Sequence, residues 1–124
     1  MRTGYCAVVC DIVHEGHIEF LKQCKDLCDY LIVGVMTDDI VEKYKGKRPT
    51  MTYNERTIVV SAIEFVDEIV PQDTFEFENN IEKYNPTIIF DSVQHKRKGA
   101  NTFIPYFEKI SSTQIKQRII DANV

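Results

Sequence analysis

Short apolar runs alternate with segments of helical periodicity along this chain. The runs at 4–10 and 29–36 are nearly continuous, as in strands that are covered on both faces. Between them, the apolar positions from Gly16 to Cys28 recur at helical spacing. Strands separated by helices of this length indicate a parallel sheet with right-handed crossovers. The sequence therefore predicts an α/β fold, a doubly wound parallel sheet.

Helix caps and chain breakers predict the remaining elements. Thr52 and Glu55 fit a capping box, and Ser111 and Gln114 fit a second one. The helix after Thr52 is expected to carry its apolar side chains on one side: Ile58, Val59, Ala62 and Ile63. Further strands are expected at 66–71, 87–90 and 102–107, further helices at 37–44, 73–84 and 111–120, and a polar loop at 91–101. The whole chain, 1–124, is then predicted to form a single three-layer domain with five strands.

Charge and composition limit the classes of function. The net charge of -4 argues against sequence-independent nucleic-acid binding, which requires a basic surface. No apolar run approaches the roughly 18 residues of a membrane helix, and no signal-peptide pattern is present, so we expect a cytoplasmic protein without membrane contact. Two short segments are nevertheless basic: Lys43, Lys45, Lys47 and Arg48, and then His95, Lys96, Arg97 and Lys98. This pattern favours binding of a small polyanion.

The four cysteines form two pairs with three residues between partners: Cys6 with Cys10, and Cys24 with Cys28. This spacing is compatible with zinc ligands, so a cysteine-based metal site is one interpretation. However, the first pair lies in an apolar strand pattern, and the second shares a helical face with apolar side chains. The pattern favours four reduced, buried thiols.

Two histidines, His14 and His17, flank Gly16 between the first strand and the first helix. We expect neither imidazole to be needed for folding of this junction. Their spacing permits metal binding, but H-E-x-x-H is absent, and a lone histidine is usually structural. A third interpretation is that both donate hydrogen bonds to phosphate beside a helix N-terminus. Ligands of a doubly wound sheet bind at the strands' carboxyl ends, where His14, Thr37 and Asp91 are expected.

The sequence around these histidines, HEGH, matches an HxGH motif. The same chain contains Asp11, then "CDYLIVGVMTDD", "KYKGKRP", "YNERTIVV", "FVDEIVP" and "ISSTQIK" in that order. Together these segments resemble the HxGH nucleotidyltransferase superfamily, and within it the cytidylyltransferases, with the glycerol-3-phosphate enzymes nearest. The resemblance spans residues 5–72 and 104–120. It implies a Rossmann-like sheet and a homodimer.

The resemblance implies that CMP passes from CTP to a phosphorylated or phosphonylated alcohol, giving a CDP-linked product and pyrophosphate. The acceptor classes are glycerol 3-phosphate, choline or ethanolamine phosphate, and aminoethylphosphonate. Such catalysis consists of positioning and charge stabilisation, with Mg²⁺ arriving on the nucleotide rather than in a protein metal site. The catalytic residues implied are His14, His17, Lys45 and Arg56. The nucleotide-binding residues implied are Val9, Cys10, Asp11, His14, His17, Lys47, Arg56, Asp91, Ile110, Ser111, Ser112 and Thr113.

The chain departs from this family pattern at three places. Val8 replaces a glycine, 91–94 reads DSVQ in place of G-D-D-W, and 106–109 reads YFEK in place of R-T-x-G. These changes surround the expected base and acceptor pockets. They indicate either a different acceptor or an inactive nucleotide-binding subunit. Two further alternatives are an ATP-dependent adenylyltransferase of the same superfamily and the cysteine-based metal-binding module.

Overall fold

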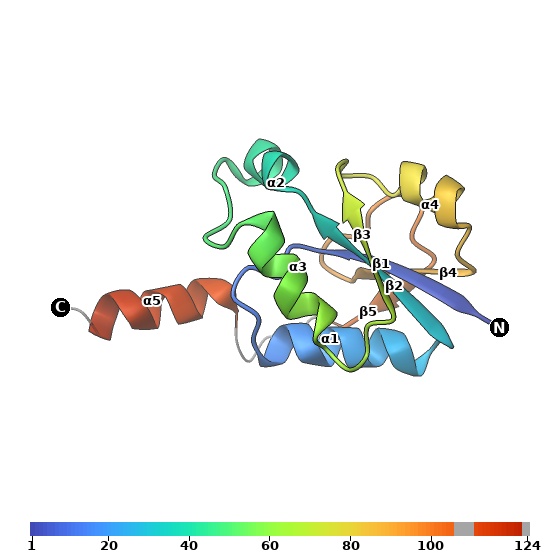
Figure 1. The fold of residues 1–124 in the computed structure, drawn as a ribbon, viewed down its shortest axis with the longest axis horizontal. Helices are drawn as coiled ribbons and strands as arrows, with labels where there is room; N and C mark the ends of the chain where they lie inside the picture. Colours follow the sequence, from blue (N-terminus) through green and yellow to red (C-terminus); the bar gives the residue numbers. More distant parts are fainter. Residues whose placement is uncertain (106–110, 123–124) are drawn as a thin grey trace.

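The computed structural model describes residues 1–105 and 111–122 and is built on a five-stranded sheet (Figure 1). The strand order is β3-β2-β1-β4-β5, and every paired strand is parallel to its neighbour. The strands are β1 (Thr3–Val8), β2 (Tyr30–Met36), β3 (Glu68–Gln72), β4 (Ile88–Ser92) and β5 (Thr102–Ile104). The direction of winding reverses between β1 and β4. The predicted Rossmann-like α/β fold with a five-stranded parallel sheet is confirmed.

Helices lie on both faces of the sheet. They are α1 (Glu15–Asp26), α2 (Asp38–Lys45), α3 (Tyr53–Ser61), α4 (Glu78–Tyr84) and α5 (Ser112–Ala122). One apolar cluster joins the sheet to α1 and α3, through Leu21 and Val60 among others. A second cluster covers the opposite face, where Ile81 of α4 packs near Phe77. Alternate residues of β1 enter these two clusters, which gives the predicted three layers.

The first strand is shorter than predicted. It ends at Val8, and Cys10 and Ile12 then have φ angles of 53° and 62°. Residues other than glycine seldom adopt this left-handed region. At these two residues the backbone turns sharply out of the sheet. The turn carries Val9, Cys10 and Asp11 across the end of the sheet instead of along it. Strain of this kind is typically retained at functional sites.

The packing face predicted for α3 is wrong. Ile58 is 69% exposed, and Ile63 lies beyond the end of the helix. The buried side chains of α3 are Arg56 and Val60. The capping box that opens this helix is confirmed, since Thr52 and Glu55 exchange both hydrogen bonds.

Other predicted boundaries shift by a few residues. The third strand occupies 68–72, the fourth 88–92, and the helix predicted from 73 begins at 78. Strand β5 covers 102–104, and residues 106–107 of its predicted range lie outside the described residues. Within 1–105 and 111–122, no helix is long and apolar enough to cross a membrane.

Helix α5 extends away from the body of the molecule (Figure 1). Its start is capped as predicted, because Ser111 N–H donates to Gln114 and Gln114 N–H donates back to Ser111 Oγ. Two further contacts join this helix to the turn after β1. Ser112 Oγ donates to the Asp11 carbonyl over 2.6 Å, and Lys116 forms an ion pair with the Asp11 carboxylate over 2.7 Å.

The cysteines are core side chains. Cys6, Cys10, Cys24 and Cys28 are all buried free thiols of the first apolar cluster. Burial raises the pKa of Cys10 and of Cys24, which keeps both thiols protonated. Across the part of the chain that the structure describes, no three His, Cys, Asp or Glu side chains gather as metal ligands. The structure therefore favours the buried-thiol interpretation over a cysteine-based metal site.

Candidate functional site

Two adjoining cavities open beyond the carboxyl ends of β1 and β4. Their volumes are about 340 and about 660 Å³. Both are lined by the turn after β1, by α1, by the end of α2 and by the start of α5; the shared residues are Val9, Cys10, His17, Val41, Lys45, Ser112 and Thr113. The rim where strand order reverses is the usual ligand site of such sheets. The two cavities together form the candidate site.

The two histidines build the start of α1, contrary to the expectation that the junction needs neither. His14 is the N-cap, and its Nδ1 accepts a hydrogen bond from Gly16 N–H over 3.0 Å. His17 Nδ1 accepts from His14 N–H over 3.1 Å. These bonds form a capping box from two imidazoles, with ring centroids 4.1 Å apart. Each imidazole thus accepts a hydrogen bond from a backbone N–H at the start of α1 that has no acceptor within the helix.

This capping also fixes the protons of both imidazoles. Since each Nδ1 accepts a hydrogen bond, the proton of the neutral ring is on Nε2. Burial and the nearby His14 ring lower the pKa of His17 to about 4, and burial lowers the pKa of His14. Both rings are thus neutral near pH 7. Each has an Nε2–H without a hydrogen-bond partner among residues 1–105 and 111–122, free for a ligand acceptor.

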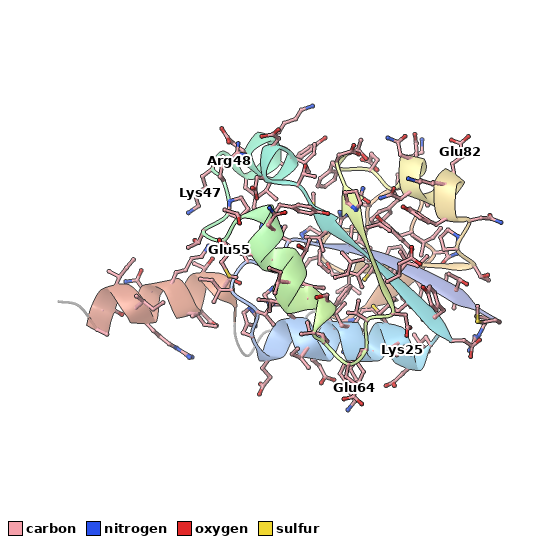
Figure 2. All side chains as sticks on the ribbon, in the orientation of Figure 1. Lys25, Lys47, Arg48, Glu55, Glu64 and Glu82 are labelled. Atoms are coloured by element: carbon pink, nitrogen blue, oxygen red, sulfur yellow. The ribbon has the colours of Figure 1, made fainter. Side chains whose placement is uncertain are left out.

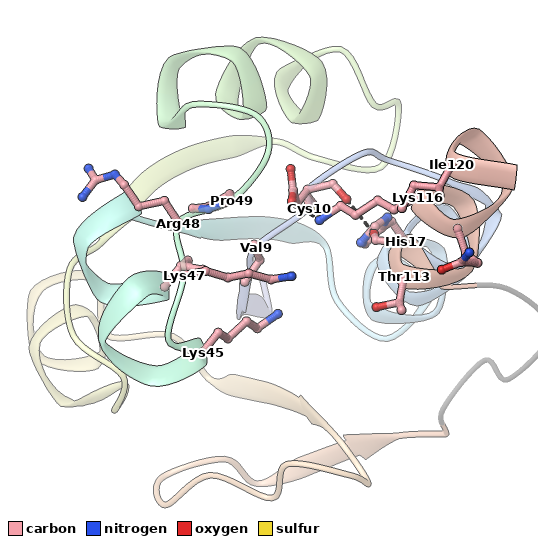
Figure 3. A pocket seen from close by; sticks show the side chains of 14 residues that line it. Val9, Cys10, His17, Lys45, Lys47, Arg48, Pro49, Thr113, Lys116 and Ile120 are labelled. Carbon is pink, nitrogen blue, oxygen red and sulfur yellow. Dashed lines mark hydrogen bonds and ion pairs between the residues drawn. The ribbon is translucent and has the colours of Figure 1, made fainter. Parts of the chain in front are cut away.

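Lysines approach the smaller cavity from the side opposite α5. Figure 3 shows Lys45 and Lys47 on one side and His17, Thr113 and Lys116 on the other. Neither Lys45 nor Lys47 has an ion-pair partner in the described part of the chain. Burial and repulsion from Lys116 lower the pKa of Lys45, and the nearby Asp11 offsets part of this effect. An anion placed between these groups would relieve that repulsion.

The loop between α2 and α3 carries Lys47 and also Arg48, whose charge has a different role. Figure 2 shows Lys47 and Arg48 on this loop, at the end of the molecule from which α5 extends. Arg48 donates hydrogen bonds to Asp39 and Glu42, so its charge is compensated locally. Lys47 thus differs from its neighbour in having no acidic partner within the described residues.

Asp11 ties this loop to α5. Its carboxylate accepts hydrogen bonds from the backbone N–H groups of Thr50 and Met51, over 2.8 and 2.9 Å, and from Lys116. Burial opposes ionisation of Asp11, but the hydrogen bonds from Lys116, Thr50 and Met51 outweigh it and lower the pKa of the carboxyl. The charge of Asp11 is therefore used within the protein, where it positions the two sides of the smaller cavity.

Comparison with known proteins agrees with this architecture. The sequence profile of the family described as cytidylyltransferase-like matches residues 9–118. The chain belongs to this family. It is 46% identical to the FAD synthase of Thermococcus sibiricus over 132 residues, covering 91% of this chain and 88% of that protein. It is 30% identical to the glycerol-3-phosphate cytidylyltransferase of Bacillus subtilis over 120 residues, covering 88% of this chain and 90% of that protein.

The fold of this cytidylyltransferase-like chain also matches a solved structure. The crystal structure of the lipopolysaccharide core biosynthesis protein from Thermoplasma volcanium superposes with a TM-score of 0.69 and 25% sequence identity. The match covers 100% of this chain and 90% of that one. The nucleotidyltransferase membership inferred from the HxGH motif is thus confirmed, while the relatives differ in the substrates their names give.

Arg56, which the resemblance implies as a phosphate-binding residue, makes its contacts within the protein. Its side chain is fully buried and lines neither cavity. The guanidinium donates to the carbonyls of Val9 and Met51 and forms a 2.7 Å ion pair with Asp38. Arg56 therefore holds the turn after β1 against α2 and α3, and its predicted contact with phosphate stays a prediction. The sequence predicted that Arg56 lies in the first turn of the helix that Thr52 caps. It could not show that the guanidinium bonds to the backbone carbonyls of Val9 and Met51.

A buried ion pair forms part of the wall of the larger cavity. Asp91 at the end of β4 accepts hydrogen bonds from Arg97 N–H, Nε and Nη2. The Arg97 guanidinium lies over the rings of Phe77 and Phe75, at 4.7 and 5.2 Å from their centroids. The sequence marked Arg97 only as one charge of a basic loop. Among the described residues, three further cations line the cavities without having been predicted as site residues: Arg48, Arg97 and Lys116.

Most residues predicted for the nucleotide site lie together. The cavities are lined by Val9, Cys10, Asp11, His14, His17, Lys45, Lys47, Asp91, Ser111, Ser112 and Thr113. Ile110 and the segment 106–109 lie outside the described residues. Val8, at the position of the family glycine, lines the larger cavity. That these lining residues contact a nucleotide remains a prediction.

Proposed function

We propose that this protein transfers CMP from CTP to a phosphorylated alcohol and releases pyrophosphate. The observation that carries the proposal is the convergence of two neutral imidazoles, two lysines and the start of α5 on one rim of the sheet. Neither lysine has an ion-pair partner within 1–105 and 111–122. This set offers hydrogen-bond donors and positive charge for a polyphosphate. It offers no nucleophilic side chain poised beside a base, and direct phosphoryl chemistry needs none.

The reaction places few demands on the protein. An oxygen of the acceptor phosphate forms a bond to the α-phosphorus, the bond from that phosphorus to the bridging oxygen breaks, and the leaving pyrophosphate keeps the electron pair. His14 and His17 would donate their Nε2–H groups to the oxygens that gain charge. Lys45 and Lys47 would neutralise the phosphates from the opposite side. Ser112 and Thr113 would add donors at the start of α5, where the helix dipole favours an anion.

Mg²⁺ fits this site only as a companion of the nucleotide. Both acidic groups that line the cavities are engaged, Asp11 with Lys116 and Asp91 with Arg97. The protein thus offers no uncompensated carboxylate for a metal ion among the described lining residues. The ion would be held by phosphate oxygens and would neutralise their charge.

ATP is a second candidate donor, supported by a specific observation. The FAD synthase of Thermococcus sibiricus, a relative 46% identical over nearly its whole length, is named for a product that contains an adenylyl group. The larger cavity, of about 660 Å³, has room for more than a three-carbon acceptor. FMN is then the acceptor to test with ATP.

Calorimetry with CTP, ATP, GTP and UTP, each with Mg²⁺, tests the proposal first. Pyrophosphate release is then measured with glycerol 3-phosphate, phosphocholine, phosphoethanolamine, aminoethylphosphonate and FMN. Preferred binding of CTP together with acceptor-dependent pyrophosphate release supports the cytidylyltransferase. Preference for ATP with FMN assigns the chain to the adenylyltransferases. Binding without turnover indicates a nucleotide-binding subunit, and no binding refutes the proposal.

A further inference from the structure

The larger cavity has a single acidic group among its described lining residues, and that group is already neutralised. Asp91 is 3% exposed, and its carboxylate receives the Arg97 guanidinium through Nε and Nη2, at 3.2 and 3.1 Å. The backbone N–H groups of Ser92 and Arg97 also donate to it, at 2.9 and 2.7 Å. With these donors in place, Asp91 has little remaining capacity to bind a cationic ligand.

Two aromatic side chains of the same cavity, Phe75 and Tyr44, are also in use, while Phe20 packs against the first apolar cluster. Cations bind well over aromatic rings, so Phe75 and Tyr44 would be the natural partners of an ammonium group. The Arg97 guanidinium, however, lies 5.2 Å from the centroid of Phe75, and the Tyr44 ring packs on Phe75 at a centroid distance of 4.3 Å. Lys45, which has no ion-pair partner among the described residues, adds positive charge to the cavity.

We infer that Arg97 determines acceptor specificity by excluding acceptors with a positively charged end. The inference rests on the proposed transfer to a phosphorylated acceptor, and it places the far end of the acceptor, rather than the nucleotide, against the wall of Asp91 and Arg97. It narrows the acceptor to a phosphate ester whose other end is not cationic. Glycerol 3-phosphate and related neutral acceptors satisfy this condition. Choline phosphate, ethanolamine phosphate and aminoethylphosphonate do not, since each carries an ammonium group.

The test compares equilibrium binding of phosphocholine and glycerol 3-phosphate by calorimetry, without nucleotide, so that it does not depend on turnover. Arg97→Gln leaves the carboxylate of Asp91 uncompensated and removes the guanidinium from Phe75, while the Tyr44 ring stays packed on it. We expect the ratio of the two affinities to shift toward phosphocholine by at least about tenfold, because the uncompensated carboxylate of Asp91 would then attract the ammonium group. The double variant with Asp91→Asn should return the ratio toward the wild-type value.

Two controls separate the proposed role of Arg97 in specificity from a general effect of losing one positive charge. Lys98→Gln removes the same charge from an exposed neighbour and should leave the ratio unchanged. Arg97→Lys keeps the charge and should keep the wild-type preference for glycerol 3-phosphate. The inference is overturned if the wild type prefers phosphocholine, or if Arg97→Gln and Lys98→Gln give the same ratio. Absence of phosphocholine binding to Arg97→Gln also overturns it, whereas failure of all nucleotide binding refutes the proposed function instead.

Discussion

His17 has two roles that one substitution can separate. Its Nδ1 accepts the hydrogen bond of His14 N–H at the start of α1, and its Nε2–H is the proposed donor to the reacting phosphates. In His17→Asn, the amide oxygen takes the place of Nδ1, while no atom replaces Nε2. The variant should keep the cap and lose the donor. We therefore expect unchanged stability and a turnover lower by about 10²–10³-fold, the usual effect of removing one transition-state donor.

His17→Ala removes both roles and supplies the comparison. Loss of a capping hydrogen bond costs about 1 kcal/mol, which lowers Tm by about 4 °C in a domain of this size. Turnover is followed by pyrophosphate release at saturating substrates, and stability by thermal unfolding. Lys22→Ala, an exposed change on the same helix, is the matched control. Near-wild-type turnover of His17→Asn would refute the donor role, and equal Tm values for the Asn and Ala variants would refute the cap.

Three further predictions follow from the same contacts. The folded-state pKa of His17 is about 4, below its ordinary value of 6.5, so protonation of this ring favours the unfolded state. The free energy of unfolding should therefore be unaffected by His17 above pH 6.5 and should fall as the pH decreases toward 4. In thermal unfolding, His17→Asn should lack this pH-dependent loss. Arg56→Met should destabilise the fold by about 3–5 kcal/mol in denaturant titrations, because it leaves the carboxylate of Asp38 without its buried partner. Unchanged stability with weaker nucleotide binding would instead support the predicted contact of Arg56 with phosphate. Lys47→Met should weaken nucleotide binding about tenfold and reduce its salt dependence, whereas calorimetry of the exposed control Lys43→Met should match the wild type.

The fold was accessible from the sequence because its signals are local. The apolar runs of β1 and β2 and the capping boxes at Thr52 and Ser111 each lie within a few adjacent residues. Strand ends were less accessible, because the turn after β1 depends on positive φ angles at Cys10 and Ile12, which no residue-type preference predicts. The face of α3 was mistaken because tertiary contacts, and not helical periodicity, decide that Arg56 is buried.

Parts of the site followed from the sequence for the same reason. The histidines, Gly16 and the start of α5 mark strand-to-helix and loop-to-helix junctions, which a sequence displays directly. The capping role of the imidazoles did not follow, since Glu or Gln is the usual third residue of a capping box. The long-range partners were also hidden: Asp11 and Lys116 are 105 positions apart, and nothing near either residue indicates the other.

These hidden partners explain how an acidic protein can present a site for an anion. The net charge of -4 is spread over the chain, but binding depends on the charges that face the cavities. There, the carboxylates of Asp11 and Asp91 are each matched by a cation from a distant or neighbouring segment, which leaves Lys45 and Lys47 uncompensated. A small polyphosphate, as proposed, would meet an excess of positive charge at the sheet edge although the molecule as a whole is negative. The same arrangement would discourage long nucleic acids, because their phosphates would extend beyond the cavity over the acidic remainder of the surface.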